Sequence, residues 1–343
     1  MPVFNRNRWL FVGLVLLTIL AFVLDVIWGS VNISLDEIFA ILAGEERSAS
    51  HVYILNNFRI PKALTALVTG AGLALSGLQM QTLFRNPLAG PFVLGISSGA
   101  GLGVAMFVMA GALFSGFALA SSTWGIVLFA IIGSALVMFM VVAVSLRVSD
   151  SVSLLIIGIM FGSVSGALVS ILQYFSDPIT THSFLVWTFG SLSGVTWNKL
   201  SVLLPMVGLG AGITFFLQKS LNALLLGENQ ALTIGVDVKK VRLWVIVSTC
   251  LMAGTITAFT GPIAFLGVAV PHMARTIFRT SDHKTTIWAS VIMGMLLMLI
   301  CDLISQMPGL HSTLPINSVT ALFGAPVVIW IIIKSRNVKA SFS

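Results

Sequence analysis

The chain has 343 residues, of which 57% are hydrophobic and only 8% are charged, with a formal net charge of +7. Because soluble domains carry about 25% charged residues, this composition excludes a water-soluble globular protein. The Lys and Arg residues separate long apolar runs, which favours a role in membrane orientation over nucleic-acid binding.

Ten apolar runs follow one another, separated by turns or charges. A membrane span needs about 20 apolar residues, and the charge-free stretch 86–146 is long enough for more than one. The first run, from Trp9 to Trp28, is too long for the apolar part of a signal peptide and precedes no A-x-A-like cleavage site, so we interpret it as a retained span. We therefore expect an all-α polytopic membrane protein with about ten transmembrane helices, at about 9–28, 62–83, 93–113, 122–146, 152–175, 199–217, 241–261, 263–278, 286–304 and 316–334.

The distribution of Lys and Arg predicts that both ends of the chain lie in the cytoplasm. Counting spans from a cytoplasmic N-terminus places fourteen of these residues inside and four outside. The four outside are Arg47, Arg59, Lys62 and Lys199. An error of one span would destroy the asymmetry.

Two segments between spans have helical signals of their own. The external stretch NISLDEIFAIL predicts a short surface helix with Ser34 as its N-cap and acidic residues in its first turn. The cytoplasmic segment 218–240 predicts two short helices, Leu221–Leu226 and Asn229–Thr233, joined at Gly227.

The stretch LFRNPLAGPFVLGISSGAG, residues 83–101, interrupts two apolar runs. Pro87 and Pro91 donate no backbone hydrogen bonds, so we expect this turn to be buried in protein or to face water rather than lipid. A second Gly-Pro step, Gly261-Pro262, precedes another interrupted run. Interrupted segments at matching places suggest an inverted repeat with halves at 59–190 and 241–334. Alternatively, the Gly-Pro steps simply end membrane helices.

Small residues recur every four positions at Gly95, Gly99 and Gly103, and again at Gly158, Gly162 and Gly166. Such a strip allows two helices to approach closely. It would also give a bulky solute a smooth surface, and the spacing alone does not separate these alternatives.

Six motifs occur in a fixed order: RIPKAL, RNPLAGPFVLGISSGA, LLLGENQALTIGV, GPIAFLGVAVPHMAR, SDHK and LPINSVTALFGAPVVIWIII. Together, from about Arg59 to Lys334, they closely resemble the FecCD-type permeases, the membrane subunits of binding-protein-dependent ABC importers for ferric siderophores, haem and cobalamin. The resemblance implies a type II importer fold forming a single permease domain over 1–343, in a bacterial or archaeal cytoplasmic membrane. It also implies a homodimer or heterodimer, two ATP-binding cassette subunits, an extracytoplasmic solute-binding protein and no cofactor.

The resemblance assigns the loop 218–240 to coupling with the ATPase. Its coupling residues are Leu224, Leu225, Leu226, Gly227, Glu228 and Ala231. The leucines and Ala231 would form an apolar plug, Gly227 allows the bend, and the Glu228 carboxylate can pair with a basic rim. Packing against the permease's own base is the alternative explanation for the leucines. The sequence contains no G-x-x-x-x-G-K-[ST] motif, so ATP would be hydrolysed by a partner.

The resemblance also assigns Arg59 and Lys62 to docking of the binding protein, with anchoring at lipid headgroups as the alternative. A further external basic position of relatives is Gln306 here. The translocation path is expected along the fifth and tenth spans, at Gly158, Gly162, Ser165, Gly166, Ser318, Thr320 and Ala321. The cytoplasmic gate is expected at Ser149, Asp150 and Ser151.

Ionisable and sulfur-containing residues in the spans have structural explanations. Asp25 and Asp302 lie near outer span ends, where we interpret them as structural. Cys250 and Cys301 lie in apolar runs and are interpreted as packing thiols. His272 is assigned to packing rather than to a metal site.

Two other classes of function were considered. An ion-gradient transporter would need a charged site near the membrane midplane, and the spans hold no central Asp, Glu, Lys or Arg. A membrane-embedded enzyme would need a catalytic motif in or beside a span, and the metalloprotease motif H-E-x-x-H does not occur. We therefore expect a transport subunit without catalysis of its own.

Overall fold

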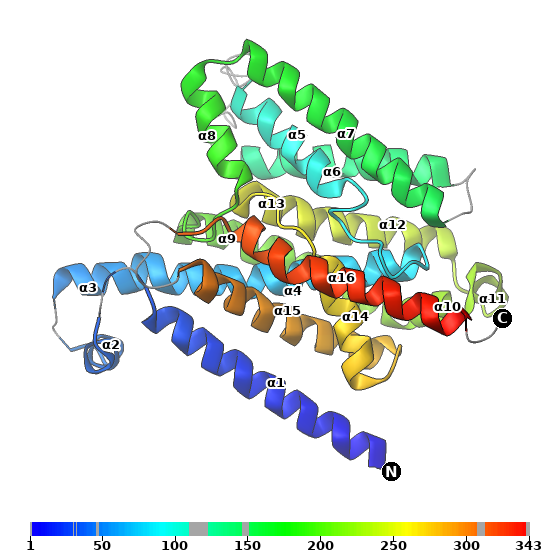
Figure 1. Cartoon of the computed structure of the whole chain (residues 1–343), viewed down its shortest axis with the longest axis horizontal. Coiled ribbons are helices and arrows are strands. Elements are labelled where there is room, and N and C mark those ends of the chain that lie inside the picture. Colours follow the sequence, from blue (N-terminus) through cyan, green and yellow to red (C-terminus); the bar gives the residue numbers. More distant parts are fainter. Residues whose placement is uncertain are drawn as a thin grey trace.

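The computed structural model describes residues 2–29, 31, 33–45, 48–109, 123–145, 151–306 and 313–340. The regular elements of this part of the chain are helices, most of them running side by side along one long direction (Figure 1). In chain order they are α1 (Pro2–Ile27), α2 (Leu35–Leu42), α3 (Ala49–Ile54), the π-helical η1 (Leu55–Arg59), α4 (Ile60–Leu83), α5 (Ile96–Met109), α6 (Thr123–Ser145), α7 (Ser151–Phe175), α8 (Pro178–Thr188), α9 (Trp197–Phe216), α10 (Gln218–Leu226), α11 (Glu228–Thr233), α12 (Val238–Thr249), the π-helical η3 (Cys250–Gly254), α13 (Thr255–Thr260), α14 (Leu266–Phe278), α15 (His283–Ser305) and α16 (Ile316–Ala340).

Where the structure describes them, all ten predicted spans coincide with helices. Seven helical stretches among the described residues are long and apolar enough to cross a membrane: Arg6–Ile27, Ala49–Leu83, Thr123–Ser145, Ser153–Phe175, Trp197–Phe216, Val238–Thr260 and His283–Ser305. Two shorter apolar helices, Ile96–Met109 and Ile316–Trp330, coincide with two further predicted spans, and the 13-residue α14 coincides with the predicted run at 263–278. The prediction of an all-α polytopic membrane protein is confirmed.

Both termini lie at the same end of the bundle, together with α10 and α11, whereas α2 and α3 lie at the opposite end (Figure 1). A contact fixes the N-terminal end: Nη2 of Arg6 donates to the carbonyl oxygen of Phe278, at the end of α14, over 3.4 Å. This arrangement fits an even number of crossings with both termini in the cytoplasm.

The centre of the bundle is α4. In its most apolar stretch 78% of the residues are buried, compared with 22% for α1 and 17% for α7. Glycines explain the tight packing: a Cβ added to Gly70 would lie 2.1 Å from the carbonyl oxygen of Gly294 in α15. Because neither glycine carries a side chain, α4 and α15 meet backbone to backbone.

Neutral polar side chains also join the central helices. The Nε2 atom of Gln79 in α4 lies 2.8 Å from Oγ1 of Thr214 in α9 and 3.0 Å from Oγ of Ser248 in α12. All three side chains are buried. Hydrogen bonding in this position satisfies polar groups that lipid could not.

The interrupted stretch after α4 is partly buried: Pro91 is buried, whereas Pro87 is exposed. A Cβ on Gly90 would lie 2.6 Å from Cγ2 of Val268, and a Cβ on Gly267 would lie 2.9 Å from Cδ of Pro91. The stretch between α4 and α5 therefore packs directly on the start of α14. The two interrupted segments of the sequence meet inside the bundle.

The predicted short helices are also present. Oγ of Ser34 accepts the backbone N–H of Glu37 over 3.3 Å, so Ser34 caps α2. α10 and α11 are joined at Gly227, as expected. Both cysteines are free and buried.

Candidate functional site

At the cytoplasmic end, α10, Gly227 and α11 form a hairpin of two short helices, which we call the cytoplasmic hook. Gly227 has a φ of 115°, a backbone conformation that residues with a Cβ rarely adopt. A Cβ there would also lie 3.4 Å from Nη1 of Arg85, in the turn after α4. The hook therefore depends on glycine for its bend.

The hook exposes several large apolar side chains. Leu225 and Leu226 in α10 are 40% and 60% exposed, Leu232 in α11 is 58% exposed, and Ile234, directly after α11, is 62% exposed. We call these four residues the hook surface. Apolar side chains gathered in this way at a water-facing end are typical of a surface that a protein partner covers.

Two predicted coupling residues lie on the other side of the hook. Leu224 and Ala231 are buried and belong to the main hydrophobic core, so they hold the hook against the bundle instead of offering a plug to a partner. Sequence reasoning missed Leu232 and Ile234, because it treated the hook as one leucine cluster. The helical period places Leu225 and Leu226 on the open side.

Glu228 pairs within the chain. Its Oε1 lies 2.6 Å from Nη2 of Arg242 in α12. The pair ties the start of α11 to the next helix, although an exposed ion pair of this kind contributes only about 0–1 kcal/mol.

The predicted path residues divide into two groups. Gly158 faces the chain's own backbone, with an added Cβ 2.8 Å from Cα of Leu94, and Gly162 faces Ser98 of α5. Ser165 and Thr320 are buried, and their hydroxyls donate to the carbonyls of Phe161 and Asn317. These four residues pack and bond within the chain.

The other path residues are open. Nothing lies within 4 Å of a Cβ added to Gly166, Ser318 is exposed, and Ala321 is partly exposed. On α7, which carries Gly166, Ile159, Val164 and other large apolar side chains are also exposed. α7 therefore exposes both small residues and large apolar side chains. This combination fits a helix that contacts another subunit and also lines a path.

The predicted gate is only partly covered by the structure. Ser149 and Asp150 lie outside the described residues. Ser151 is the first residue of α7, and its side chain is likewise outside the described part.

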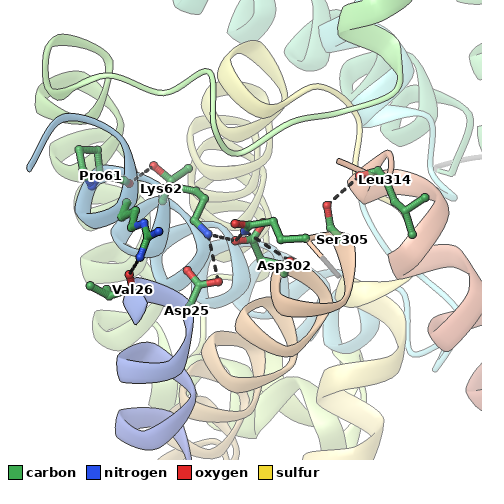
Figure 2. A network of polar contacts seen from close by, with 10 residues as sticks. Asp25, Val26, Pro61, Lys62, Asp302, Ser305 and Leu314 are labelled. Carbon is green, nitrogen blue, oxygen red and sulfur yellow. Dashed lines mark hydrogen bonds and ion pairs between the residues drawn. The ribbon is translucent and has the colours of Figure 1, made fainter. Parts of the chain in front are cut away.

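Lys62 does not lie on the outer surface, contrary to its predicted docking role. It is buried, and Nζ lies 2.8 Å from Oδ2 of Asp302 and 3.3 Å from Oδ1 of Asp25. Figure 2 shows Lys62 between these two carboxylates, which come from α15 and α1. The side chain is buried because it joins three helices, and the prediction that Asp25 and Asp302 are structural agrees with these contacts.

Arg59 is buried for a related reason. Its guanidinium donates to the backbone carbonyls of Val26, Ile27 and Val31, at and just after the end of α1. A cation at a helix C-terminus satisfies free carbonyls and the negative end of the helix dipole. Both predicted docking cations are therefore used inside the fold, and neither has the surface exposure that direct docking requires.

Gln306, which stands where relatives have a basic residue, joins the same group. Its Nε2 donates to Oδ2 of Asp302 over 2.6 Å. The amide supplies a donor to the carboxylate without adding a second buried cation.

The histidines show packing and polar contacts. The ring of His272 meets Trp330 edge to face, with centroids 6.3 Å apart, and His182 is exposed on α8. His311 lies outside the described residues. In the described part of the chain no three His, Cys, Asp or Glu residues gather in a way that could hold a metal ion.

A polar cluster beside the hook was not predicted. It consists of Thr82, Asn222, Asp282 and His283, and we call it the inner polar cluster. Asp282 caps α15 by accepting the backbone N–H of Lys284 over 3.1 Å. That bond, followed by one from the Asn222 side chain, lowers the pKa of Asp282 below its ordinary value of 3.8. The motif SDHK was the only sequence signal for this cluster.

Comparisons of the sequence and of the fold with known proteins indicate the same class of transport protein. Residues 17–334 match the model of the FecCD transport family. The chain is 34% identical to the vitamin B12 import system permease protein BtuC of Klebsiella pneumoniae over 333 residues, covering 97% of this chain and 95% of that protein. It is 35% identical to BtuC of Photorhabdus laumondii over 284 residues, 81% of each chain. A solved structure of a metal-chelate type ABC transporter, in an inward-facing conformation, superposes with a TM-score of 0.80 and 28% identity, covering 95% of this chain and 99% of that one.

Proposed function

Because this chain belongs to the FecCD transport family, we propose that it is the permease subunit of a binding-protein-dependent ABC importer. It is a multi-pass protein of the cytoplasmic membrane. In this proposal two permease subunits, identical or related, surround one path. Two ATP-binding cassette subunits bind on the cytoplasmic side, and a solute-binding protein delivers cargo on the outer side.

The observation that carries the proposal is the hook surface. Leu225, Leu226, Leu232 and Ile234 expose apolar side chains at the end of the bundle that also holds both termini. Gly227 fixes the bend, and Leu224 and Ala231 fix the hook to the bundle. An apolar surface on a rigid support suits a cleft in an ATPase subunit, because burial against it transmits movement in both directions.

The motifs and the buried charges of this chain indicate the energy source of transport. Its sequence has no Walker A motif, so it has no phosphate-binding loop of that kind. The buried side chains of Asp25, Lys62 and Asp302 pair with one another near the outer ends of their helices, away from the membrane midplane. These facts support ATP hydrolysis in a partner over an ion gradient acting on this chain.

The cargo we propose is a metal chelate: cobalamin or a ferric siderophore, with haem as a further member of the class. Relatives named as vitamin B12 permeases and the structural likeness to a metal-chelate type transporter support this class. We place the path along the open residues Gly166, Ser318 and Ala321, where two subunits meet. Small side chains there would leave room for a bulky chelate.

We also propose that residues 59–190 and 241–334 are two related halves and that the gate lies at 149–151. Supporting the first point, each Gly-Pro step is followed by an irregular segment and then by a new helix, α5 or α14. These segments contact one another at Gly90 and Val268.

The test is uptake into proteoliposomes holding this chain with the ATPase and binding protein of the same organism. We expect ATP-dependent accumulation of labelled cobalamin or a ferric siderophore, and no accumulation by the chain alone. Accumulation by the chain alone, driven by a proton or sodium gradient, would replace the proposal with secondary transport.

A further inference from the structure

The inner polar cluster links the hook to two helices of the bundle through one side chain. Asn222, on α10, donates from Nδ2 to Oδ1 of Asp282 over 2.7 Å. Its Oδ1 accepts the backbone N–H of His283 over 2.8 Å and lies 2.8 Å from Nδ1 of the same histidine. Asn222 therefore joins α10 to the beginning of α15.

His283 carries the link further. It is 1% exposed, and its Nε2 lies 2.9 Å from Oγ1 of Thr82, in the last turn of α4. The imidazole thus lies between Asn222 of the hook and Thr82 of the most buried helix. A side chain enclosed in this way moves only with its neighbours.

The donor and acceptor roles in the cluster are set by Asp282. As a carboxylate it only accepts, so the amide nitrogen of Asn222 faces it and the amide oxygen faces His283. Because that oxygen also accepts the backbone N–H, Nδ1 must carry the proton. Nε2 is then the acceptor that faces the Thr82 hydroxyl, whose one proton lies within reach of both Nε2 and the carbonyl oxygen of Leu78, each 2.9 Å from Oγ1.

The end of α4 leads to the interrupted stretch. Next to Thr82, Nε2 of Gln81 lies 3.1 Å from the carbonyl oxygen of Val268, and its Oε1 accepts from Arg275. The chain then enters the turn that packs Pro91 on Gly267. A shift at the last turn of α4 thus reaches the place where the two interrupted segments meet.

We propose that Asn222, His283 and Thr82 form a relay that transmits movement of the cytoplasmic hook to α4 and α15, with His283 as a positioning residue. The inference rests on the proposed function, since it assumes that the hook binds the ATPase. It predicts that breaking the relay lowers the cargo moved per ATP hydrolysed, while the complex still assembles.

An exchange of two residues gives the sharpest test. Asn222→Asp alone places two carboxylates side by side and should lower cargo moved per ATP by about tenfold, because a hydrogen bond to a charged group is replaced by repulsion between like charges. Asn222→Asp combined with Asp282→Asn restores the match of donor and acceptor between the two side chains. The carboxylate introduced on α10 accepts both His283 donors. The amide introduced before α15 donates to that carboxylate through its nitrogen, and after a rotation of the side chain its oxygen caps the helix. The double variant should recover the wild-type ratio to within about threefold.

Assembly is checked first, by copurification with the ATPase and by thermal unfolding. If Asn222→Asp does not assemble, the pair Thr82→Val and Thr82→Ser decides the matter. Valine keeps the shape of threonine but removes the hydroxyl that His283 needs, so cargo per ATP should fall, whereas serine should preserve it.

The outcomes separate the relay from the proposed function. No ATP-dependent uptake by the wild-type complex would overturn the proposed function itself. If the wild-type complex couples ATP hydrolysis to uptake, either of two results would overturn the relay alone. One is a normal amount of cargo per ATP in Asn222→Asp. The other is a double variant that assembles but does not recover the wild-type ratio. If Asn222→Asp does not assemble, an equal amount of cargo per ATP in Thr82→Val and Thr82→Ser would overturn the relay.

Discussion

Gly77 of α4 and Gly267 of α14 bring their backbones together so closely that a Cβ added to Gly77 would lie 1.7 Å from the carbonyl oxygen of Gly267. Since that atom is backbone, no side-chain rotation relieves the overlap. The contact holds the central helix against the start of α14, next to the turn that carries Pro91.

Gly77→Ala should therefore disturb the central packing. We expect a loss of about 1–3 kcal/mol of stability or more, because an inserted methyl group must push two backbones apart. The measurement is thermal unfolding of the purified permease in detergent. Gly101→Ala in α5 is the matched control, since nothing lies within 4 Å of a Cβ there. Equal stability of the two variants would contradict the close packing.

The hook surface leads to a prediction about assembly. Leu225→Glu places a charge on a surface that we expect to be buried against the ATPase, so copurification of the ATPase should fall by at least about tenfold, as burial of an unpaired charge costs several kcal/mol. Membrane insertion should be unchanged. Leu314→Glu is the control, because Leu314 has the same 40% exposure but follows α15, near the outer end. Normal ATPase binding by Leu225→Glu would remove the hook from the interface.

The outer charge cluster leads to a prediction about folding. Lys62→Met leaves Asp25 and Asp302 buried beside each other, and breaking a buried pair of this kind costs about 3–5 kcal/mol. We expect a lower unfolding temperature and faster proteolysis. Lys199→Met should change little, because Lys199 is less enclosed and only its bond to the carbonyl of Gly194 is lost.

A rescue experiment separates folding from docking at the same site. Replacing Asp25 and Asp302 with asparagine in the Lys62→Met background removes the buried negative charge and should recover part of the lost stability. A stable Lys62→Met permease with reduced affinity for the binding protein would instead support the docking role.

The Asp282 carboxylate leads to a pH prediction. Bonds from the Lys284 backbone and from Asn222 lower its pKa below 3.8, so the native state binds a proton less readily than the unfolded state. Its contribution to stability is therefore present above 3.8 and is lost as pH falls through the lower native pKa. Thermal unfolding should show a wild-type advantage over Asp282→Asn that is constant from about pH 5 to about pH 8 and shrinks below about pH 4. An advantage that grew on acidification would contradict the assignment.

The sequence was sufficient for the membrane fold, because hydrophobic length, charge-free runs and Lys and Arg asymmetry are properties of one chain read in order. The same holds for α2, capped by Ser34, and for the bend at Gly227, since capping and positive φ are local requirements. The ordered motifs further identified the family.

The tertiary structure alone decided which side each functional residue faces. In sequence, Arg59 and Lys62 resemble free cations on the outer side. In the structure Arg59 donates to carbonyl groups at and just after the end of α1, and Lys62 pairs with Asp25 in α1 and Asp302 in α15. Leu224 and Leu225 are neighbours in one leucine run, yet one is buried and the other exposed. Local patterns fix secondary structure, whereas burial and pairing depend on which distant helices pack together, and no single segment contains that information.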